Sequence, residues 1–368
     1  MGGSGFLGQH IVRELQERDP RVTEIRVLDL LPYNNRLGHE IKKPIVSIVG
    51  DITAPDSCKN AFRDVDCVIH CAALVTYDYP SDLRRLQNIN VQGTRNVIKL
   101  CIEMNIPRLV FTSTSEVTLV PLFKRGFFAA VVHQTETKAG WPKDPTDLVF
   151  SDYASTKLQA ERIILQAHGT PLKSGLKLRT VALRPTPLYG EEDRGLLPRL
   201  MSVADQLEGT FPRISGPGGK HQLTYAGNAA WAHVCAKDSL LDSPTAVGGL
   251  SVFVTDDSPI TDVTKFCVHL TTSDQRSPYK HSWWYLPSLV SYFLALLLEP
   301  ILTAVYGSMP FRPSAAVTFL ASIVLYSRLR ADTHLRYSPV YTYESVRTRT
   351  IKYYIEEARL RASHKKLI

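Results

Sequence analysis

The sequence contains few cysteines, and they are not spaced as metal ligands or as a disulfide framework. Six occur among 368 residues, without a CxxC pair or a regular interval. Zinc ligands usually come in closely spaced pairs, and disulfide-rich domains are short and denser in cysteine. We therefore expect free thiols in a reducing compartment and no metal site.

Motifs for nucleic-acid binding are also absent, although the chain is basic. The formal net charge is +8, and within residues 327–368 ten Lys and Arg stand against four Asp and Glu. No DNA-binding motif or aromatic–basic pattern accompanies this excess. The charge therefore favours an anionic membrane surface over a nucleic-acid partner.

The first eight residues, MGGSGFLG, form a glycine-rich loop. Gly2, Gly5 and Gly8 recur every third residue, a spacing that permits a tight turn, a close approach of backbone N–H groups to a pyrophosphate, and packing of the next helix on a sheet. Apolar residues at helical spacing follow immediately, from Phe6 to Leu15. The pattern indicates a dinucleotide site.

Such a loop normally leaves the end of a buried strand, and no strand precedes it here. That strand would lie in the centre of the sheet, so its absence leaves two neighbouring strands without ladder partners, at roughly 1–3 kcal/mol for each unpaired buried group. We expect a strand and its lead-in, about five to twelve residues in all, upstream of Met1. The start at Met1 would then be that of a truncated gene model or of an isoform.

Strands and helices alternate along the next hundred residues. This rhythm predicts a parallel sheet with helical crossovers, which binds its ligand at the carboxyl ends of the strands. The expected strands span 24–30, 45–49, 66–71 and 108–112, and the expected helices lie near 57–62 and over 88–104.

Asp29 ends the first of these strands, about twenty residues beyond the last loop glycine. A carboxylate there accepts hydrogen bonds from the adenosine ribose hydroxyls and repels a 2′-phosphate, which favours NAD over NADP. A turn-forming Asp at a strand end is an equally weighted alternative.

A Tyr and a Lys stand four residues apart at the start of an amphipathic helix over 151–167. Tyr153 and Lys157 share one helix face, and an ammonium beside a phenol is expected to lower the tyrosine pKa from about 10. Alone, such a pair is more often solvated surface. Its position after the glycine loop and after the hydroxyls of Thr112–Ser115 favours a catalytic pair instead.

Together these segments resemble the 3β-hydroxysteroid dehydrogenase/Δ5-Δ4 isomerase family of extended short-chain dehydrogenases/reductases. The resemblance runs in order over nearly the whole chain. Its segments are HCAALV at 70–75, NVQGTRNVI at 90–98, FTSTSEV at 111–117, FSDYASTKLQAE at 150–161, LRPTPLYGEED at 183–193, AGNAAWAHV at 226–234 and RYSPVYTYESVRTRTIKYY at 336–354.

The resemblance implies an α/β fold, a Rossmann-type doubly wound parallel sheet with a smaller substrate-binding region and C-terminal hydrophobic helices. The first strand is missing from the sequence. The implied parts are an NAD-binding domain over 1–190, a substrate-binding region with interleaved Rossmann elements over 191–280, a hydrophobic membrane-associated segment over 281–330, and a C-terminal helix and basic tail over 331–368.

The resemblance also assigns roles to residues of the site. Tyr153 would be the general base that takes the proton of a 3β-hydroxyl, and Lys157 would bind the nicotinamide ribose and lower the tyrosine pKa. Thr114 would supply the accompanying hydroxyl, with Ser113 as the fallback. Pro185 would lie against the nicotinamide.

Further residues are expected around the NAD cofactor. Asp51 and Ile52 follow the second strand, and Ala72 follows the third, where small side chains leave room for a flat ligand. The less regular segments 119–145 and 195–219, with the chain after Pro259, are expected to form the substrate side of the cleft.

The implied activity is NAD-dependent oxidation of a steroid or sterol 3β-hydroxyl to a ketone, with or without Δ5-to-Δ4 isomerisation. No isomerase acid or base is assigned. A sterol-4α-carboxylate 3-dehydrogenase, whose product loses CO₂, is the near alternative. A membrane-bound pseudoenzyme is the alternative of another class, and a nucleotide-sugar epimerase is disfavoured.

A hydrophobic C-terminal region favours membrane association. Residues 286–306 approach the ~20 apolar residues of a bilayer span, but two prolines and Glu299 argue against a simple span. Residues 315–326 have the length of a core or interfacial helix, and the aromatic triplet at 283–285 is typical of a membrane interface. We expect a monotopic or hairpin anchor, the alternative being helices packed on the catalytic domain.

The last four residues, KKLI at 365–368, resemble a dilysine retrieval signal. No signal peptide precedes the glycine loop. We therefore expect the endoplasmic reticulum membrane with a cytosolic catalytic domain, in preference to a mitochondrial membrane. A homodimer is left open.

Overall fold

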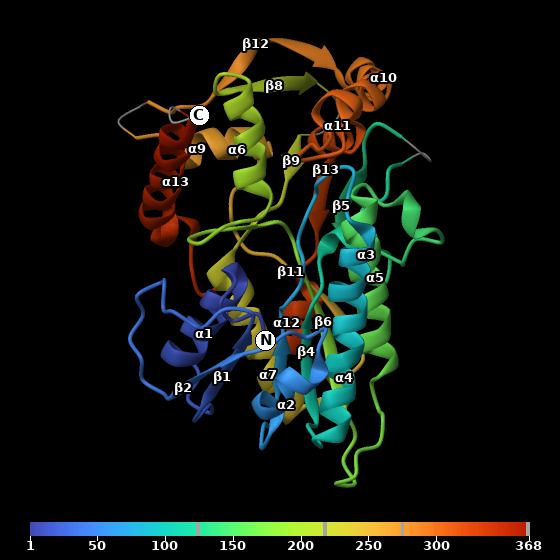
Figure 1. Cartoon of the computed structure of the whole chain (residues 1–368), viewed down its shortest axis with the longest axis vertical. Coiled ribbons are helices and arrows are strands. Elements are labelled where there is room, and N and C mark those ends of the chain that lie inside the picture. The colour runs from blue at the N-terminus through green and yellow to red at the C-terminus, as the bar shows by residue number, and fades with distance from the viewer. Residues whose placement is uncertain (123–125, 216–218, 274–275, 366–368) are drawn as a thin grey trace.

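A computed structural model describes residues 1–122, 126–215, 219–273 and 276–365 of the chain. At its centre is a four-stranded sheet with the order β11-β6-β4-β3 (Figure 1). All three strand pairs are parallel, as the alternation of strands and helices predicted. The strands span Val68–His70 (β3), Arg108–Thr112 (β4), Arg179–Pro185 (β6) and Ser251–Val254 (β11).

The side chains of these strands alternate between two apolar layers. In β4, Leu109 and Phe111 pack against helices on one face of the sheet, and Val110 packs against helices on the other. The result is a three-layer, doubly wound α/β fold, as expected. The first set of helices is α2 (Pro55–Phe62), α4 (Gly93–Glu103) and α5 (Ser151–Gln166), and the second is α1 (Phe6–Glu17), α7 (Ala226–Asp242) and α12 (Leu329–Leu335).

The sheet is interrupted beside β3. Strands β1 (Ile25–Asp29) and β2 (Ile45–Val49) form a separate parallel pair, and no strand lies between β1 and β3 among the described residues. The amine of Met1 donates to a carbonyl of β3 at 2.8 Å, and the N–H of Gly2 donates to a carbonyl of β1 at 2.8 Å. The rest of the space between β1 and β3 is a cavity of about 480 Å³. The strand expected before the glycine loop is thus missing from the sheet.

The helix predicted over 88–104 is divided. Its first part, Gln87–Gln92, is a π-helical turn between α3 (Leu83–Leu86) and α4. Asn90 in this turn donates to Thr156 Oγ1 at 3.0 Å and accepts the N–H of Leu74 at 2.8 Å. This turn therefore ties the loop after β3 to α5, and π-helical turns are frequently found at functional sites.

The upper part of the molecule contains smaller sheets and the apolar helices (Figure 1). The helix predicted over 315–326 is only partly correct, because α11 ends at Leu320 and residues 323–326 form strand β13, parallel to β5 and β9. The run IVLY is rich in residues that favour strands. The elements here are β5 (Ala130–Gln134), α6 (Leu196–Gln206), β8 (Thr210–Ser215), β9 (Lys220–His221), α9 (Val263–Leu270), β12 (Lys280–Pro287), α10 (Ser288–Tyr306), α11 (Pro313–Leu320), β13 (Ile323–Tyr326) and α13 (Tyr343–Lys365).

Only the first residue of the expected dilysine signal at 365–368 lies within the described part of the chain. Residues 366–368 lie outside the described residues, and α13 is described up to Lys365. The signal therefore stays a prediction from the sequence.

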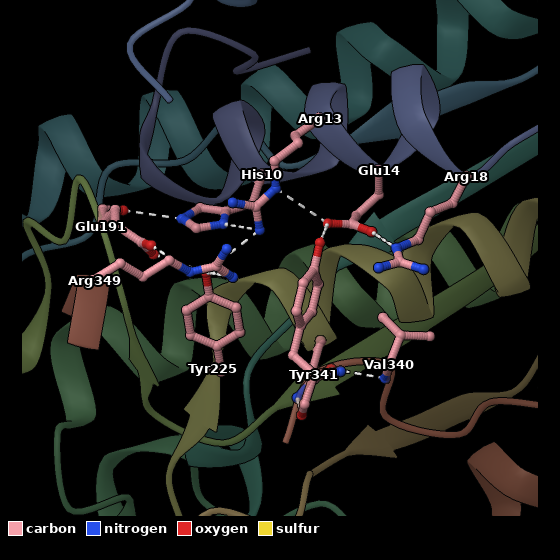
Figure 2. Close-up of polar contacts among 10 residues, drawn as sticks. His10, Arg13, Glu14, Arg18, Glu191, Tyr225, Val340, Tyr341 and Arg349 are labelled. Atoms are coloured by element: carbon pink, nitrogen blue, oxygen red, sulfur yellow. Dashed lines mark hydrogen bonds and ion pairs between the residues drawn. The ribbon is translucent and has the colours of Figure 1, made fainter. Parts of the chain in front are cut away.

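A partly buried polar network holds α1 against the C-terminal part of the chain (Figure 2). Glu14 accepts a hydrogen bond from Tyr341 Oη at 2.8 Å and pairs with Arg13 at 3.3 Å. Arg349 of α13 forms an ion pair of 2.8 Å with Glu191, which lies in the loop after strand β7 (Leu188–Tyr189). His10 of α1 contacts the carbonyl oxygen of Glu191 at 2.9 Å, and Tyr225 Oη accepts hydrogen bonds from both Arg13 and Arg349. These contacts link the helix that follows the glycine loop to α13 and to the loop leading into α6.

Candidate active site

The glycine loop folds tightly against the end of β3. Gly2 has a φ of 78°, and a Cβ there would lie 2.7 Å from the backbone nitrogen of Ala72. A Cβ at Gly8 would lie 2.0 Å from the carbonyl oxygen of Gly2. Gly5 is the N-cap of α1, and no side chain caps the first-turn N–H groups. The positive end of the helix is therefore available to a pyrophosphate.

Two carboxylates lie at the carboxyl ends of β1 and β2: Asp29 is the last residue of β1, and Asp51 follows β2. Asp29 Oδ2 accepts the N–H of Ser4 at 2.9 Å, which places this carboxylate beside the glycine loop. Asp51 Oδ1 accepts the N–H of Thr53 at 2.8 Å, and the neighbouring Ile52 is buried. Asp29 therefore lies beside the glycine loop, and its role as a ribose ligand stays a prediction.

Lys157 projects from the first turns of α5 toward the end of β4. Its Nζ donates to the carbonyl oxygen of Thr112 at 2.6 Å and lies 4.3 Å from the ring centroid of Phe111. Burial lowers the pKa of Lys157 to about 8, although Cys71 and Glu161 act in the opposite direction. The ammonium is therefore held at the sheet edge by a backbone carbonyl and an aromatic face.

The environment of Tyr153 differs from the expectation. The side chain is 7 % exposed, and burial raises the pKa of Tyr153, with a further contribution from the carboxyl of Glu116. The sequence predicted a lowered pKa because of Lys157. Loss of hydration is the largest influence on this pKa and Lys157 is not among its causes, whereas the Nζ of Lys157 donates to the Thr112 carbonyl.

Thr114 and Ser113 stand at the end of β4 but have different partners. Ser113 Oγ donates to Glu161 Oε2 at 2.5 Å, within a buried cluster. Thr114 Oγ1 accepts a long bond, 3.3 Å, from the N–H of Glu116. Among the described residues its hydroxyl hydrogen has no acceptor, so Thr114 is better placed than the fallback, Ser113, to donate to a ligand.

One cavity of about 520 Å³ brings the expected residues together. It runs from the glycine loop to the ends of β4 and β6, where the carboxyl ends of parallel strands form the usual ligand edge. Gly195 and Leu196 join its wall from the expected substrate segments, whereas no described residue of 119–145 does. The lining includes Gly2, Gly5, Gly8, Asp29, Asp51, Ile52, Ala72, Thr114, Tyr153, Lys157 and Pro185.

Two lining residues were not identified from the sequence. Glu116 is 4 % exposed, and its Oε1 accepts a hydrogen bond from Tyr77 Oη at 2.7 Å. Burial raises the pKa of Glu116 to about 7, and the Tyr77 hydroxyl opposes this shift. The ring of Tyr77 also contacts that of Tyr153, with centroids 5.7 Å apart. The acid in the segment FTSTSEV was the available signal for Glu116, whereas no local pattern marked Tyr77.

A buried ion pair behind the site was also missed. Glu161 on α5 accepts from Arg184 Nη2 at 2.5 Å and from Arg184 Nε at 3.0 Å, and both side chains are almost fully buried. Trp141 Nε1 donates to the same carboxylate at 3.0 Å. The pair joins the helix of Tyr153 to strand β6, which ends at Pro185.

Solved structures of low sequence identity share this fold. A UDP-glucose 4-epimerase of Thermus thermophilus, in complex with NAD, is 22% identical with a TM-score of 0.62, covering 96% of this chain and 97% of its own. MoeE5 in complex with UDP-glucuronic acid and NAD is 18% identical with a TM-score of 0.65, covering 97% and 98%. At these identities the likeness concerns the fold alone.

Sequence comparisons are more specific. The proteins named 3 beta-hydroxysteroid dehydrogenase type 7 of Mus musculus and Homo sapiens are 31% and 32% identical, covering 96% and 95% of this chain and 94% and 93% of their own. A family model described as the 3-beta hydroxysteroid dehydrogenase/isomerase family matches residues 1–287. The chain therefore belongs to the 3-beta hydroxysteroid dehydrogenase/isomerase family.

Proposed function

We propose that the protein oxidises the 3β-hydroxyl group of a steroid or sterol to a ketone, with NAD as the electron acceptor. The observation that carries this proposal is the meeting of Tyr153, Lys157 and Thr114 with the glycine loop in one cavity. The family membership supplies the substrate class. The near-complete set of expected residues also disfavours the pseudoenzyme alternative.

The residues around the glycine loop fit a dinucleotide. Gly2 and Gly8 leave no space for a Cβ, so the loop backbone can lie close to a pyrophosphate, and the carboxylate of Asp29 would bind the adenosine ribose. Pro185, at the end of β6, would contact the nicotinamide. When bound, NAD supplies the acceptor of the hydride that leaves C3 of the substrate.

Tyr153 would take the proton of the substrate hydroxyl, and Thr114 would donate a hydrogen bond to the same oxygen. Because burial raises the pKa of Tyr153, its phenolate needs a nearby positive charge. Lys157 stands four residues along α5, on the same face, and remains mostly protonated below its pKa of about 8. We assign it the stabilisation of the phenolate and the binding of the nicotinamide ribose.

The apolar upper part of the molecule supports a membrane location. Among the described residues, α10 is the one helix long and apolar enough to cross a membrane, and most of it is exposed. Trp283, in the strand β12 that leads into this helix, is 90% exposed. We propose that this region attaches the enzyme to the endoplasmic reticulum membrane with the active site in the cytosol. The four-part domain division expected from the sequence remains part of the proposal.

Product analysis distinguishes the leading activity from its near alternative. Purified protein is incubated with NAD and either a Δ5-3β-hydroxysteroid or a 4α-carboxysterol, and NADH and the extracted sterols are quantified. We expect a 3-ketosteroid from the first substrate. Turnover of the 4α-carboxysterol alone, with release of CO₂, would replace this proposal by the decarboxylating one. No NADH from either substrate would contradict both.

A further inference from the structure

Arg36 joins the glycine loop to the loop that follows β7. It lies in the connection between β1 and β2, at residues 30–44, and its Nη2 donates to the carbonyl oxygen of Ser4 at 2.5 Å. Its Nε forms an ion pair of 2.6 Å with Oε2 of Glu192. The N–H of Ser4 donates to Asp29. This residue of the glycine loop is therefore held through both its N–H group and its carbonyl oxygen.

The connection that carries Arg36 is itself fixed to helix α1. The backbone N–H of Arg36 donates to Oε1 of Gln9 at 3.3 Å, and Nε2 of the same glutamine donates to the carbonyl oxygen of Asn34 at 2.8 Å. Gln9 is fully buried. The guanidinium of Arg36 is thus presented by a segment that is anchored on the helix of the glycine loop.

The backbone of Glu192 is held in a conformation that residues other than glycine rarely adopt. Its φ is 67°, in the left-handed region. The neighbouring residues fix this loop, because Glu191 pairs with Arg349 of α13 at 2.8 Å (Figure 2) and Asp193 Oδ1 accepts the N–H of Gly195 at 2.7 Å. Strained residues of this kind are concentrated at active sites and ligand clamps. The position of Glu192 therefore points to a functional contact.

The ion pair connects two sides of the cofactor cavity without lining it. Gly5 lines the cavity on the side of Arg36, and Arg194 and Gly195 line it on the side of Glu192. Neither member of the pair is among the described residues that form the wall. Gly5 is also the N-cap of α1, where no side chain caps the first-turn N–H groups and a pyrophosphate can bind. The pair thus joins the two sides close to the expected pyrophosphate.

We propose that the ion pair between Arg36 and Glu192 is a strap that holds the glycine loop and the loop 190–195 together around bound NAD and so slows release of the cofactor. Both side chains act through the loops that carry them, and they are positioning residues. The inference deepens the proposed function and rests on it for the identity of the cofactor.

The strength of the strap suits a contact that opens in each catalytic cycle. The side chains of Arg36 and Glu192 are 26% and 21% exposed, so water and salt partly screen their attraction. Surface ion pairs change an equilibrium constant by up to about fivefold, and the bond of Arg36 to the Ser4 carbonyl adds to this. The strap therefore retains the cofactor and still allows it to leave.

The rate of NADH release measures the strap directly. NADH bound to the purified full chain is displaced by excess NAD, and the loss of its fluorescence is followed by stopped flow. We expect release from Arg36→Met to be about three- to tenfold faster than from the wild type. In turnover with a 3β-hydroxysteroid, KM for NAD should rise, whereas kcat should not fall and KM for the steroid should stay unchanged.

Arg26→Met is the matched control. Arg26 also forms an ion pair of 2.6 Å with a carboxylate, that of Glu24, and its side chain is 25% exposed, but it lies outside the wall of the cofactor cavity. Its loss should leave the rate of NADH release unchanged. Equal acceleration in Arg26→Met and Arg36→Met would show a general effect of lost charge and would overturn the inference.

Glu192→Gln distinguishes a strap from a direct contact between Arg36 and the cofactor. The substitution removes the negative charge and keeps the size of the side chain. A strap predicts faster release, as in Arg36→Met, and little further change when the two substitutions are combined. Slower release from Glu192→Gln would show that the freed guanidinium binds the cofactor phosphates, and the strap would be rejected.

Exchange of the two charges tests the pair apart from the structure of the loops. Arg36→Glu alone places two carboxylates together and should release NADH at least as fast as Arg36→Met. Adding Glu192→Arg restores an ion pair and should slow release at least about threefold relative to Arg36→Glu alone. No recovery in the doubly substituted protein would count against the pair.

The outcomes separate this inference from the proposed function. Release from Arg36→Met within about twofold of the wild-type rate would overturn the strap, whether or not the protein oxidises a steroid. A protein that follows these release rates but does not oxidise a 3β-hydroxysteroid would contradict the proposed function alone. A wild-type protein that does not bind NADH would contradict both.

Discussion

At this site, burial changes the pKa values of individual residues more than their neighbours in the sequence do. Tyr153, Lys157 and Glu116 are all buried, and in each case burial is the largest influence on the pKa. It raises the pKa of the two acids and lowers that of the lysine, because a charged form is poorly solvated in an apolar wall. Burial therefore favours the neutral form of each of these three groups.

The proposed preference for NAD depends on one carboxylate. Replacing Asp29 by alanine removes the group to which we assign binding of the ribose hydroxyls and repulsion of a 2′-phosphate. We expect kcat/KM with NAD to fall by about 10- to 100-fold, from a loss of roughly 1.5–3 kcal/mol, and the NADP value to rise relative to it. Asp56→Ala, at an exposed carboxylate on α2, is the matched control. An unchanged ratio of the two cofactors in Asp29→Ala would argue against the assignment.

The raised pKa of Glu116 has a measurable effect on stability. Between the ordinary value of 4.5 and the folded value of about 7, the folded state binds a proton that the unfolded state has lost. Stability therefore decreases as pH rises through this window, by roughly 3 kcal/mol at most, and stays low above it. Glu116→Gln lacks this dependence.

Urea unfolding of the wild type and Glu116→Gln at pH 5 and pH 8 measures the effect. We expect the stability of the variant relative to the wild type to be higher at pH 8 than at pH 5. A difference that does not vary with pH would show that Glu116 titrates normally.

At the scale of elements, the regular helices and strands were predictable, and the exceptions follow from long-range contacts. Periodicity identified α1 and α5, and β2 and β4 match their predicted bounds. The π-helical turn at 87–92 depends on the contacts of Asn90 with Leu74 and Thr156, which no local pattern reveals. Strand β13 likewise depends on pairing with distant β5 and β9.

The same distinction applies to the site. Tyr153, Lys157, Thr114 and the glycines belong to recognisable local patterns, and the structure places them around one cavity. Tyr77 reaches Glu116 through the loop after β3, over a separation of 39 residues. Contacts of this kind depend on the tertiary fold, so spacing along the chain could not identify them.

The ion pair between α5 and β6 is expected to stabilise the site as a unit. Glu161→Gln would leave the buried guanidinium of Arg184 without its counter-charge, which typically costs about 3–5 kcal/mol. Urea denaturation measures the loss. Glu103→Gln, at an exposed pair with Lys99, should change stability by no more than about 0.5 kcal/mol. A similarly small change at Glu161 would contradict the role of the pair.

At the scale of the whole molecule, the catalytic sheet and the apolar surface lie at different ends. Helix α10 stands at the top of the structure, whereas α1 and β1 lie below the centre (Figure 1). Contiguous exposed apolar surface is characteristic of an interaction site. The arrangement therefore suits attachment to a bilayer with the cofactor site held in water.

Membrane attachment through α10 can be tested with charged substitutions on its exposed face. Phe293→Glu combined with Leu297→Glu should strongly reduce cosedimentation with vesicles of phosphatidylcholine and phosphatidylserine, because buried charge in lipid is unfavourable. Leu241→Glu, at an exposed apolar residue of α7, is the control and should bind as the wild type does. Equal binding of all three proteins would exclude α10 as the anchor.

The central claim is that Tyr153 performs the proton transfer of a 3β-hydroxysteroid oxidation. The most direct measurement compares NADH formation from a saturated 5α-3β-hydroxysteroid by the wild type and by Tyr153→Phe, with NAD binding measured on both. We predict a rate at least about a hundredfold lower for the variant, with NAD affinity unchanged within about threefold. NADH formation by Tyr153→Phe at close to the wild-type rate would contradict the account.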